Sequence, residues 1–515
     1  MLMLRRAILA AFYRGPSSRL FGTYSSHLKY SNRQRIPIEA GQALHENRPN
    51  LIKQGELTPG ISSIEYFERR INLASKLPPK SCVVIAGNQV KFASGPVFYP
   101  FQQNNDMYYL TGWNEPDSVM ILEKPNNDLN QVVFHLVVPP KDAFAEQWEG
   151  YRTGPEGARE IFNADESTDL SSLPSYLSNI FDRNEYIYFD TPKDRTNFNH
   201  SAFFSTFFSL QTLSDGHQTI MDVIKKKGTL KKICGISKTI GELRKIKSPA
   251  ELRIMRRAGQ ISGRAYNQAY ANRFRNERTL QAFLEYKFLA GGCDKSSYIP
   301  VVAAGSNGLC IHYTGNDDVM YDDEMVLVDA SGSLGGYCTD ISRTWPVDGK
   351  FTDPQRDLYE AVLNVQRKCI DLCRAHNGYS IHDIHEKSLE FTKVELRNVG
   401  FRDIQKWEVN KLFPHYIGHQ LGLDVHDTPD ASRHQSLQAG QVITIEPGIY
   451  IPDQSCYPSY FRNIGIRIED DIAIGQHNYT NLTVEAAKEI HDLENIMQNG
   501  VTTKIEEDVV SPLKD

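Results

Sequence analysis

The chain of 515 residues lacks several features, and each absence argues against a class of protein. No run of 18 or more apolar residues occurs, so the sequence predicts no membrane-spanning helix. The G-x-S-x-G motif of many serine hydrolases and the H-E-x-x-H motif of thermolysin-like peptidases are both missing. Only eight cysteines are present and none forms a C-x-x-C pair, which disfavours a disulfide framework and fits a reducing compartment.

Acidic residues are absent from the first 38 positions, although the whole chain contains 63 of them. The same stretch carries seven Arg or Lys residues, and Leu4, Ile8 and Phe12 can share one face of a helix. This composition is typical of a mitochondrial transit peptide. The sequence therefore predicts a leader over residues 1–38 and a location in the mitochondrial matrix or on the matrix side of the inner membrane. A disordered basic tail is the alternative.

The charge balance argues against a nucleic-acid partner. Without the seven positive charges of the leader, the formal net charge changes from −6 to −13. Because an acidic surface repels the phosphate backbone, no nucleic-acid binding is expected.

One stretch, Met325–Val347, contains an apolar run, a glycine-rich turn and a second apolar run, which is typical of a β-hairpin. If the turn is centred between Leu334 and Gly335, Asp329 lies opposite Asp340. Directly opposed side chains have Cβ atoms about 5 Å apart, and like charges there destabilise the sheet. Neither strand provides a Lys or Arg beside these aspartates, so the pair predicts a bound cation.

Two more strand-like runs, QVITIEPGIYI and NIGIRIEDDIAI, repeat this arrangement between residues 441 and 474. The predicted register sets Ile451 opposite Ile464. It also sets Glu446 opposite Glu469, which brings a second pair of carboxylates together.

Three histidines lie between the two hairpins in the sequence FPHYIGHQLGLDVHD: His415, His419 and His426. Carboxylates with one or two imidazoles suit Mn²⁺, Co²⁺, Fe²⁺ or Zn²⁺, and several carboxylates suit a bridged pair of ions. The residue types therefore predict a dinuclear hydrolytic metal site.

The order and spacing of five of these residues resemble the metal ligands of the pita-bread metallopeptidases. That family includes methionine aminopeptidase, prolidase and proline aminopeptidase. The segments VDASG, TDISRTW, GHQLGLDVHD, IEPGIYI and GIRIEDD are similar to the proline-aminopeptidase branch, and the resemblance covers roughly residues 60–492. The five residues are Asp329, Asp340, His419, Glu446 and Glu469.

The resemblance implies a role for each ligand. Two divalent ions are expected, Mn²⁺ first, with Co²⁺, Zn²⁺ or Fe²⁺ as alternatives. Glu446 is implied as the base that accepts a proton from the attacking water and returns it to the leaving nitrogen. The implied division is Asp329 on one ion, His419 and Glu446 on the other, and Asp340 and Glu469 as bridges.

Five further residues are implied at the substrate. His312 and His426 resemble the outer histidines that stabilise the leaving amine and the tetrahedral oxyanion. Arg467 shares strand parity with Glu469 and is expected to orient that carboxylate or to bind a backbone carbonyl. The positions that line the cleft in relatives are His415, Tyr450 and Arg467.

The predicted fold class is α/β (α+β), with an amino-terminal α/β domain before a pseudo-symmetric pita-bread domain. Ser248, Pro249 and Glu251 form a helix start, after which two helices and a hairpin occur twice. This order indicates an internal duplication. The predicted segments are 1–38 (leader), 39–57 (linker), 58–238 (amino-terminal domain), 239–494 (metallopeptidase domain) and 495–515 (mobile acidic tail).

The expected function is removal of the single N-terminal residue from peptides, or from imported precursors after the mitochondrial processing peptidase. Peptide or precursor N-termini are the expected partners, and the resemblance implies a homodimer or tetramer. The alternatives are a general Xaa-Pro aminopeptidase, a prolidase-type dipeptidase and a non-catalytic binding protein.

Overall fold

The structure is a computed structural model that describes residues 40–190, 214–227, 231–501 and 507–513. The predicted leader, residues 1–38, lies outside the described residues. Among the helices that are described, none has both the length and the apolar character needed to cross a membrane.

The amino-terminal domain is built on a six-stranded sheet with the strand order β10-β9-β3-β6-β7-β8. Strands β3, β6 and β7 are antiparallel neighbours, while β8, β9 and β10 add to the sheet in parallel. The bounds are β3 (Ser81–Ala86), β6 (Val119–Lys124), β7 (Val133–Val138), β8 (Glu166–Asp169), β9 (Tyr186–Tyr188) and β10 (Lys232–Cys234).

Helices cover both faces of this sheet. Because successive side chains of a strand point to opposite faces, Val83 and Ile85 pack in one core with α2 and α3. Cys82 and Val84 pack in another core with α6 and α9. The helices are α2 (Ser63–Ser75), α3 (Asn105–Thr111), α4 (Ala143–Glu149), α5 (Gly154–Glu160), α6 (Leu173–Arg183), α9 (Asp215–Lys227) and α10 (Ser237–Arg244).

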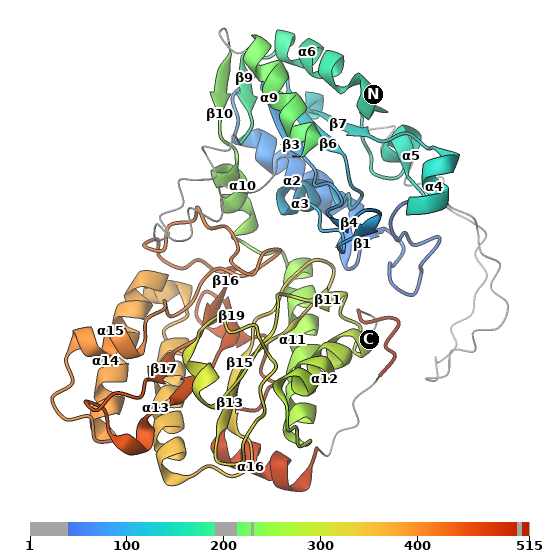
Figure 1. The fold of residues 1–515 in the computed structure, drawn as a ribbon. Coiled ribbons are helices and arrows are strands. Elements are labelled where there is room, and N and C mark those ends of the chain that lie inside the picture. Colours follow the sequence, from blue (N-terminus) through green and yellow to red (C-terminus); the bar gives the residue numbers. More distant parts are fainter. Residues whose placement is uncertain (1–39, 191–213, 228–230, 502–506, 514–515) are drawn as a thin grey trace, which may run out of the picture. The chain divides into compact units, whose positions relative to one another are not determined.

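The carboxy-terminal domain contains the predicted repeat of two helices followed by antiparallel strands. Figure 1 shows α11 and α12 on one side of the strands, and α13 and α14 on the other. The first half comprises α11 (Pro249–Tyr270), α12 (Glu277–Ala290), β12 (Val301–Ala304), β13 (Met325–Asp329) and β15 (Ser342–Pro346). The second comprises α13 (Asp353–Ile370), α14 (Ile381–Asn398), α15 (Lys406–Leu412), β16 (Val442–Ile445), β17 (Gly448–Ile451), β18 (Ile464–Arg467) and β19 (Asp470–Ile474).

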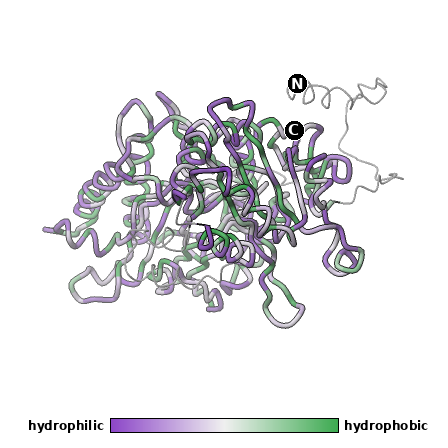
Figure 2. The backbone as a smooth tube through the Cα atoms, turned by 90° about the horizontal axis from the view of Figure 1, so that it is seen from above, coloured by the Kyte–Doolittle hydropathy of each residue, from purple (hydrophilic) through white to green (hydrophobic). Residues whose placement is uncertain are grey.

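The helix start predicted at Ser248 is confirmed. The Ser248 hydroxyl accepts the N–H of Glu251, and the Glu251 carboxylate accepts the N–H of Ser248, so a capping box opens α11. The buried faces of the helices and strands form a continuous apolar core. Figure 2 shows hydrophobic stretches among the strands and hydrophilic ones on outlying loops.

The predicted register of the first hairpin is wrong. Asp329 pairs with Ser342 rather than with Asp340. The reversal occurs at Gly335 and Gly336, whose φ values of 57° and 84° suit a two-residue hairpin turn. The sequence SGSLGGY contains three glycines, and the prediction placed the turn one residue too early.

The register predicted for the second hairpin is confirmed, since Ile451 pairs with Ile464 in β17–β18. The ladder continues in β16–β19, where Ile445 pairs with Asp470. Glu446 and Glu469 lie at the break between these two strand pairs.

Described residues of the predicted linker (39–57) and of the predicted mobile tail (495–515) are packed against the fold. Leu44 and Ile52 are buried in the first segment. In the second, Val509 donates its N–H to the carbonyl of Ala290, and the carbonyl of Pro512 accepts a hydrogen bond from Arg257. Between residues 39 and 57 and beyond Gly500 the few apolar residues follow no helical or strand period, so this packing could not be predicted from local patterns.

Candidate metal centre

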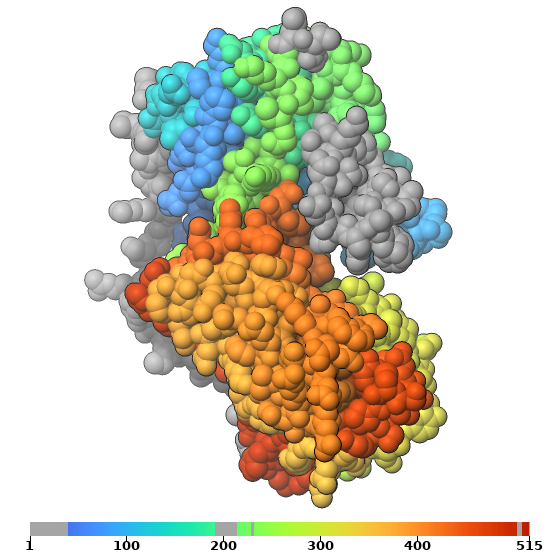
Figure 3. All heavy atoms as spheres, turned by 90° about the vertical axis from the view of Figure 1, so that its left-hand side faces the viewer, coloured from blue at the N-terminus to red at the C-terminus, as the bar shows by residue number. Residues whose placement is uncertain are grey.

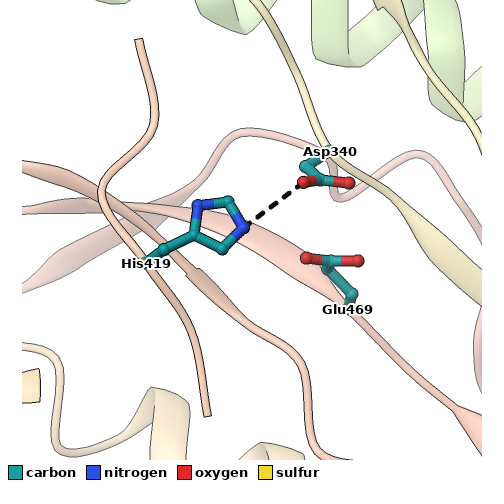
Figure 4. A group of neighbouring side chains, drawn as sticks. All are labelled: Asp340, His419 and Glu469. Atoms are coloured by element: carbon teal, nitrogen blue, oxygen red, sulfur yellow. Dashed lines mark ion pairs between the residues drawn. The ribbon is translucent and has the colours of Figure 1, made fainter. Parts of the chain in front are cut away.

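Three of the predicted ligands form one cluster: Asp340, His419 and Glu469 each offer a ligand atom, and these atoms lie within 4.8 Å of one another. Figure 4 shows the three side chains pointing toward one another from separate backbone segments. Asp340 precedes β15, His419 lies on the loop before β16, and Glu469 lies between β18 and β19.

The other two predicted ligands adjoin this cluster. The hydroxyl of Tyr298 lies between two carboxylates, 2.5 Å from Oδ1 of Asp329 and 2.6 Å from Oδ1 of Asp340. Nε2 of His419 lies 3.5 Å from Oδ2 of Asp340 and 3.6 Å from Oε1 of Glu446. The structure therefore brings together all five residues that the sequence singled out.

The charge in this cluster favours a cation. Burial raises the pKa of Asp329 to about 6 and that of Glu446 to about 7, and the neighbouring carboxylates add to both shifts. Burial and the same repulsion raise the pKa of Glu469 well above its usual value. Although burial favours the neutral imidazole, Asp340 and Glu446 raise the pKa of His419 to about 9. Four converging carboxylates with one imidazole are thus short of positive charge.

The tautomer of His419 also suits a metal ion. Its Nδ1 lies 3.0 Å from the carbonyl oxygen of Gln420, and a carbonyl only accepts. One proton of His419 therefore resides on Nδ1. Release of the second proton, from Nε2, gives a lone pair that faces the carboxylates and can bind a cation. Four carboxylates and one imidazole fit a bridged pair of divalent ions.

Arg467 contacts Asp329 directly and reaches Glu469, the carboxylate that was predicted, through the Ser342 hydroxyl. Its positive charge opposes the rise in the pKa of Glu469. Its guanidinium is buried and donates to Oδ2 of Asp329 at 2.7 Å, to the hydroxyl of Tyr450 at 2.7 Å and to Oγ of Ser342 at 2.8 Å. Glu469 accepts the Ser342 hydroxyl at 2.6 Å. The alternation of side chains correctly predicted that Arg467 points toward the metal centre from β18. Its side chain, however, extends to Asp329 at the end of β13.

His415 and Tyr450 extend the chain of hydrogen bonds from Arg467. Nδ1 of His415 donates to the carbonyl of Tyr416, and Nε2 accepts from the Tyr450 hydroxyl at 2.9 Å. Burial lowers the pKa of His415 to about 3, which keeps the ring neutral for this arrangement. The three residues predicted to line the cleft are therefore joined to one another and to Asp329.

The two predicted outer histidines occupy different surroundings. The ring of His426 lies edge-on to that of His419, with centroids 4.4 Å apart. The positive charge of His419, together with burial, lowers the pKa of His426 to about 3. His312 lies on the exposed loop that follows the short helix η4 (Gly305–Leu309).

Sequence reasoning missed three supporting residues, Tyr298, Ser342 and Thr444. The Thr444 hydroxyl accepts the N–H of His419 at 3.1 Å and lies 3.3 Å from Oε1 of Glu446. Thr444 lies on β16, two residues before Glu446. Because side chains two residues apart in a strand point to the same face, the alternation along the strand could have identified Thr444. Tyr298 precedes a different strand, and no local pattern connects it with the aspartates.

The two repeated halves, with carboxylates from both converging on one histidine, define the class of the pita-bread metallopeptidases. The chain belongs to metallopeptidase family M24 and is of the aminopeptidase P type. The family M24 model matches residues 253–476, and the model of the aminopeptidase P N-terminal domain matches residues 66–188.

The similar proteins include intermediate cleaving peptidase 55 of Saccharomyces cerevisiae, which is 64% identical over 99% of this chain and 100% of its own. Its crystal structure, lacking 58 N-terminal residues, has a TM-score of 0.79 and covers 87% of this chain and 100% of that chain. Human Xaa-Pro aminopeptidase 3 is 36% identical over 90% of this chain and 92% of its own. Arabidopsis thaliana intermediate cleaving peptidase 55, mitochondrial, is 35% identical over 90% of this chain and 88% of its own. The predicted family, fold class and enzyme class are confirmed.

Proposed function

We propose that this metallopeptidase removes one N-terminal residue from mitochondrial precursors that a processing peptidase has already cut. The observation that carries the proposal is the 64% identity to yeast intermediate cleaving peptidase 55 over the full length of both chains. The acid-free composition of residues 1–38 and the name of the Arabidopsis relative support a mitochondrial location. The matrix, or the matrix side of the inner membrane, is the proposed compartment.

The five clustered residues are proposed to hold two divalent ions, Mn²⁺ before Co²⁺, Zn²⁺ or Fe²⁺. When bound, the ions supply Lewis acidity and lower the pKa of water toward neutrality. The proposed ligands are Asp329 for one ion, His419 and Glu446 for the other, and Asp340 and Glu469 for both.

Side chains of the chain itself are proposed to move the protons. Glu446 is proposed to accept a proton from the attacking water and to return it to the leaving nitrogen. His426 and His312 are proposed to stabilise the oxyanion and the leaving amine. His415, Tyr450 and Arg467 are proposed to line the cleft, where their mutual hydrogen bonds hold Asp329 in place.

The division into an amino-terminal domain (58–238) and a metallopeptidase domain (239–494) and a homodimer or tetramer remain part of the proposal. A non-catalytic binding role is disfavoured because all five ligand types are present and converge. Metal analysis of the purified protein tests this point: the proposal expects stoichiometric divalent metal, whereas a binding protein would retain none.

Mapping of precursor N-termini tests the biological role. In cells that lack this protein, some mitochondrial proteins should begin one residue earlier than in wild-type cells. Unchanged N-termini would contradict the proposal. The measurement is mass spectrometry of N-terminal peptides from isolated mitochondria.

A general Xaa-Pro aminopeptidase is the second candidate, favoured by the 36% identity to human Xaa-Pro aminopeptidase 3. Three synthetic peptides separate the alternatives: a long peptide with a bulky first residue and no proline, a long Xaa-Pro peptide, and an Xaa-Pro dipeptide. The proposed function requires cleavage of the first. Cleavage of the second alone indicates a general Xaa-Pro aminopeptidase, and cleavage of the dipeptide alone indicates a prolidase.

A further inference from the structure

An ion network lies beside the loop that carries His426. Arg244, the last residue of α10, places its guanidinium among three carboxylates. Its Nη1 donates to Asp106 at 2.7 Å, and its Nη2 donates to Asp424 at 2.6 Å and to Asp427 at 2.5 Å. The side chains of Arg244 and Asp427 are 8% and 1% exposed, so their ion pair is weakly screened, whereas Asp424 lies at the solvent-exposed edge of the network.

Asp427 is the member of the network held by the most contacts. Its two carboxylate oxygens accept from Arg244 and, at 2.9 Å, from Lys247, and the Lys247 and Asp427 side chains are each 1% exposed. The backbone N–H of Asp427 donates to the carbonyl of Gln420 at 2.9 Å. Because Asp427 directly follows His426, these contacts fix the backbone on one side of that histidine.

The backbone next to Asp427 has a conformation that requires outside support. Thr428 has a φ of 45°, which is disfavoured for a β-branched residue. A Cβ placed on Gly422 would lie 2.5 Å from Oδ2 of Asp427, so the loop backbone packs directly against the ion pair. Strained backbone of this kind persists only where its surroundings determine it, and it is concentrated at functional sites.

The network connects the loop to helix α3 of the amino-terminal domain. Asp106 belongs to the first turn of that helix, and its neighbour Asn105 donates to the carbonyl of Leu423 at 3.0 Å and to Asp424 at 2.6 Å. In Figure 3 the orange part of the chain, which contains the loop, lies against the green part, which contains α10.

The same loop reaches the metal centre at its other end. The His426 ring lies 4.4 Å from the ring of His419, measured between centroids. Nε2 of His419 in turn faces Asp340 and Glu446. A displacement of the backbone at Asp427 would therefore change where His426 lies relative to the metal ligands.

We propose that Arg244 is a positioning residue that fixes the orientation of His426 by bridging Asp106 and Asp427. Through this bridge, the amino-terminal domain sets the geometry in which His426 meets the reacting carbonyl. The proposal rests on the proposed peptidase function and adds a residue that touches neither metal nor substrate.

The central test is the variant Arg244→Lys. Lysine keeps the positive charge, so the fold should be preserved. Its ammonium group lacks the planar array of N–H donors with which the guanidinium binds three carboxylates, so the bridge is lost. Misplacement of a catalytic group by about 1 Å can lower the reaction rate about 100-fold. We therefore expect kcat to fall by about 10- to 100-fold, with KM changed less than about twofold. Asp106→Asn should lower kcat in the same direction but less.

A double variant separates positioning from a general structural effect. If Arg244 acts through His426, adding Arg244→Lys to His426→Ala should lower kcat no further than His426→Ala alone. Multiplicative losses would overturn the proposal. Arg183→Gln is the matched control, because it breaks an ion pair of 2.6 Å to the buried Glu123 in the amino-terminal sheet and should leave kcat unchanged.

Hydrogen–deuterium exchange gives a readout that is independent of activity. In Arg244→Lys, the amides of residues 419–428 should exchange faster than in the wild-type protein, while those of β3 and β6 remain protected. Unchanged exchange in 419–428 would overturn the proposal. If the wild-type protein cleaves none of the three test peptides, the proposed function fails, but the exchange measurement still decides whether Arg244 holds the loop.

Discussion

Asp329 and Glu446 occupy corresponding places in the two halves of the carboxy-terminal domain, yet their surroundings differ. Both oxygens of Asp329 have close partners: Tyr298 at 2.5 Å and Arg467 at 2.7 Å. Glu446 has only longer contacts: the Thr444 hydroxyl at 3.3 Å, Nε2 of His419 at 3.6 Å and Nδ1 of His415 at 3.7 Å. One carboxylate is held by strong donors, and the other keeps most of its accepting capacity.

This difference shows how a duplicated fold can give two carboxylates separate tasks. Hydrogen bonds to an ionised carboxylate lower its basicity and restrict its movement, which suits a fixed ligand. Burial raises the pKa of both groups by a similar amount, to about 6 for Asp329 and to about 7 for Glu446, so the contrast between them lies in their hydrogen-bond partners. Glu446 is therefore the member of the pair that is suited to carry a proton.

The largest expected effect comes from Glu446→Gln, which preserves the size of the side chain and removes its basicity. We expect kcat to fall by about 10²- to 10⁴-fold, because general base catalysis contributes about that much. Peptide hydrolysis and metal content should be measured together. Glu485→Gln, at a partly buried ion pair with Arg256, is the control and should retain full activity.

A loss of bound metal in parallel with the loss of activity would mean that Glu446 acts only as a ligand. Glu446 would then be a fixed metal ligand like Asp329, and the proposed difference in their roles would be wrong.

The next effect in size is expected for Arg467→Met, which removes the donor shared by Asp329, Tyr450 and Ser342. Loss of such an outer partner should weaken metal binding by about 10- to 100-fold. Leaving the buried carboxylate unpaired should also lower the free energy of unfolding by about 3–5 kcal/mol. Metal titration and chemical denaturation measure the two effects.

The metal affinity and stability of Arg467→Lys should lie between those of Arg467→Met and the wild-type protein, since lysine restores the charge but not the planar guanidinium. Equal metal affinity in Arg467→Met and the wild-type protein would contradict the role given to this residue.

A smaller effect is expected in the pH dependence of the metal-stripped protein. The pKa values of Asp329 and Glu446 are raised to about 6 and 7 in the folded chain, above the value of about 4 in the unfolded chain. For these two groups the folded state binds more protons between about pH 4 and pH 7, so their contribution to stability decreases over that range. His415 and His426, with pKa values lowered to about 3, contribute the opposite slope up to about pH 6.5, so the net decrease is expected above that pH. The raised pKa of His419, about 9, continues this decrease above pH 6.5.

Thermal unfolding of chelated protein from pH 6.5 to pH 9 measures this slope. It should be shallower in Glu446→Gln and absent when excess Mn²⁺ keeps the carboxylates ionised. A midpoint that rises with pH in the chelated protein would show that the sign is wrong.

The smallest effect is expected for Thr444→Val, which removes the contact to Glu446 and the acceptor of the His419 N–H. The loss of one such hydrogen bond is worth about 1 kcal/mol, so kcat should fall about two- to fivefold. Thr444→Ser should restore activity, because serine supplies the hydroxyl. A loss as large as that of Glu446→Gln would show that Glu446 is held as firmly as Asp329.

The sequence predicted those parts of the site that depend on local patterns. Residue type and spacing identified the four carboxylates, and the family resemblance selected His419 from three candidate histidines. Strand alternation predicted the pairing of Ile451 with Ile464. The Ser248 capping box was likewise readable within four residues. These features need no knowledge of how distant segments pack.

Features that depend on contacts between distant segments were missed. Tyr298 meets Asp329 and Asp340 only because the chain before β12 folds against the first hairpin. Arg467 reaches β13 rather than its own strand neighbour Glu469, and such a reach is decided by how the strands pack. The register of the first hairpin depended on which of several glycines forms the turn.

The segment that ends at Leu513 has a practical consequence for shortening or labelling the protein. Pro512 lies against Gly292, and Asn50 donates to the carbonyl of Val510, so this short stretch joins α12 to residues near the start of the described chain. A truncation after Gly500 would remove Leu513 from its place beside Gly60 and Ile254. The exposed apolar patch would favour aggregation and proteolysis. Purification handles placed beyond Asp515 are safer than deletions that remove this stretch.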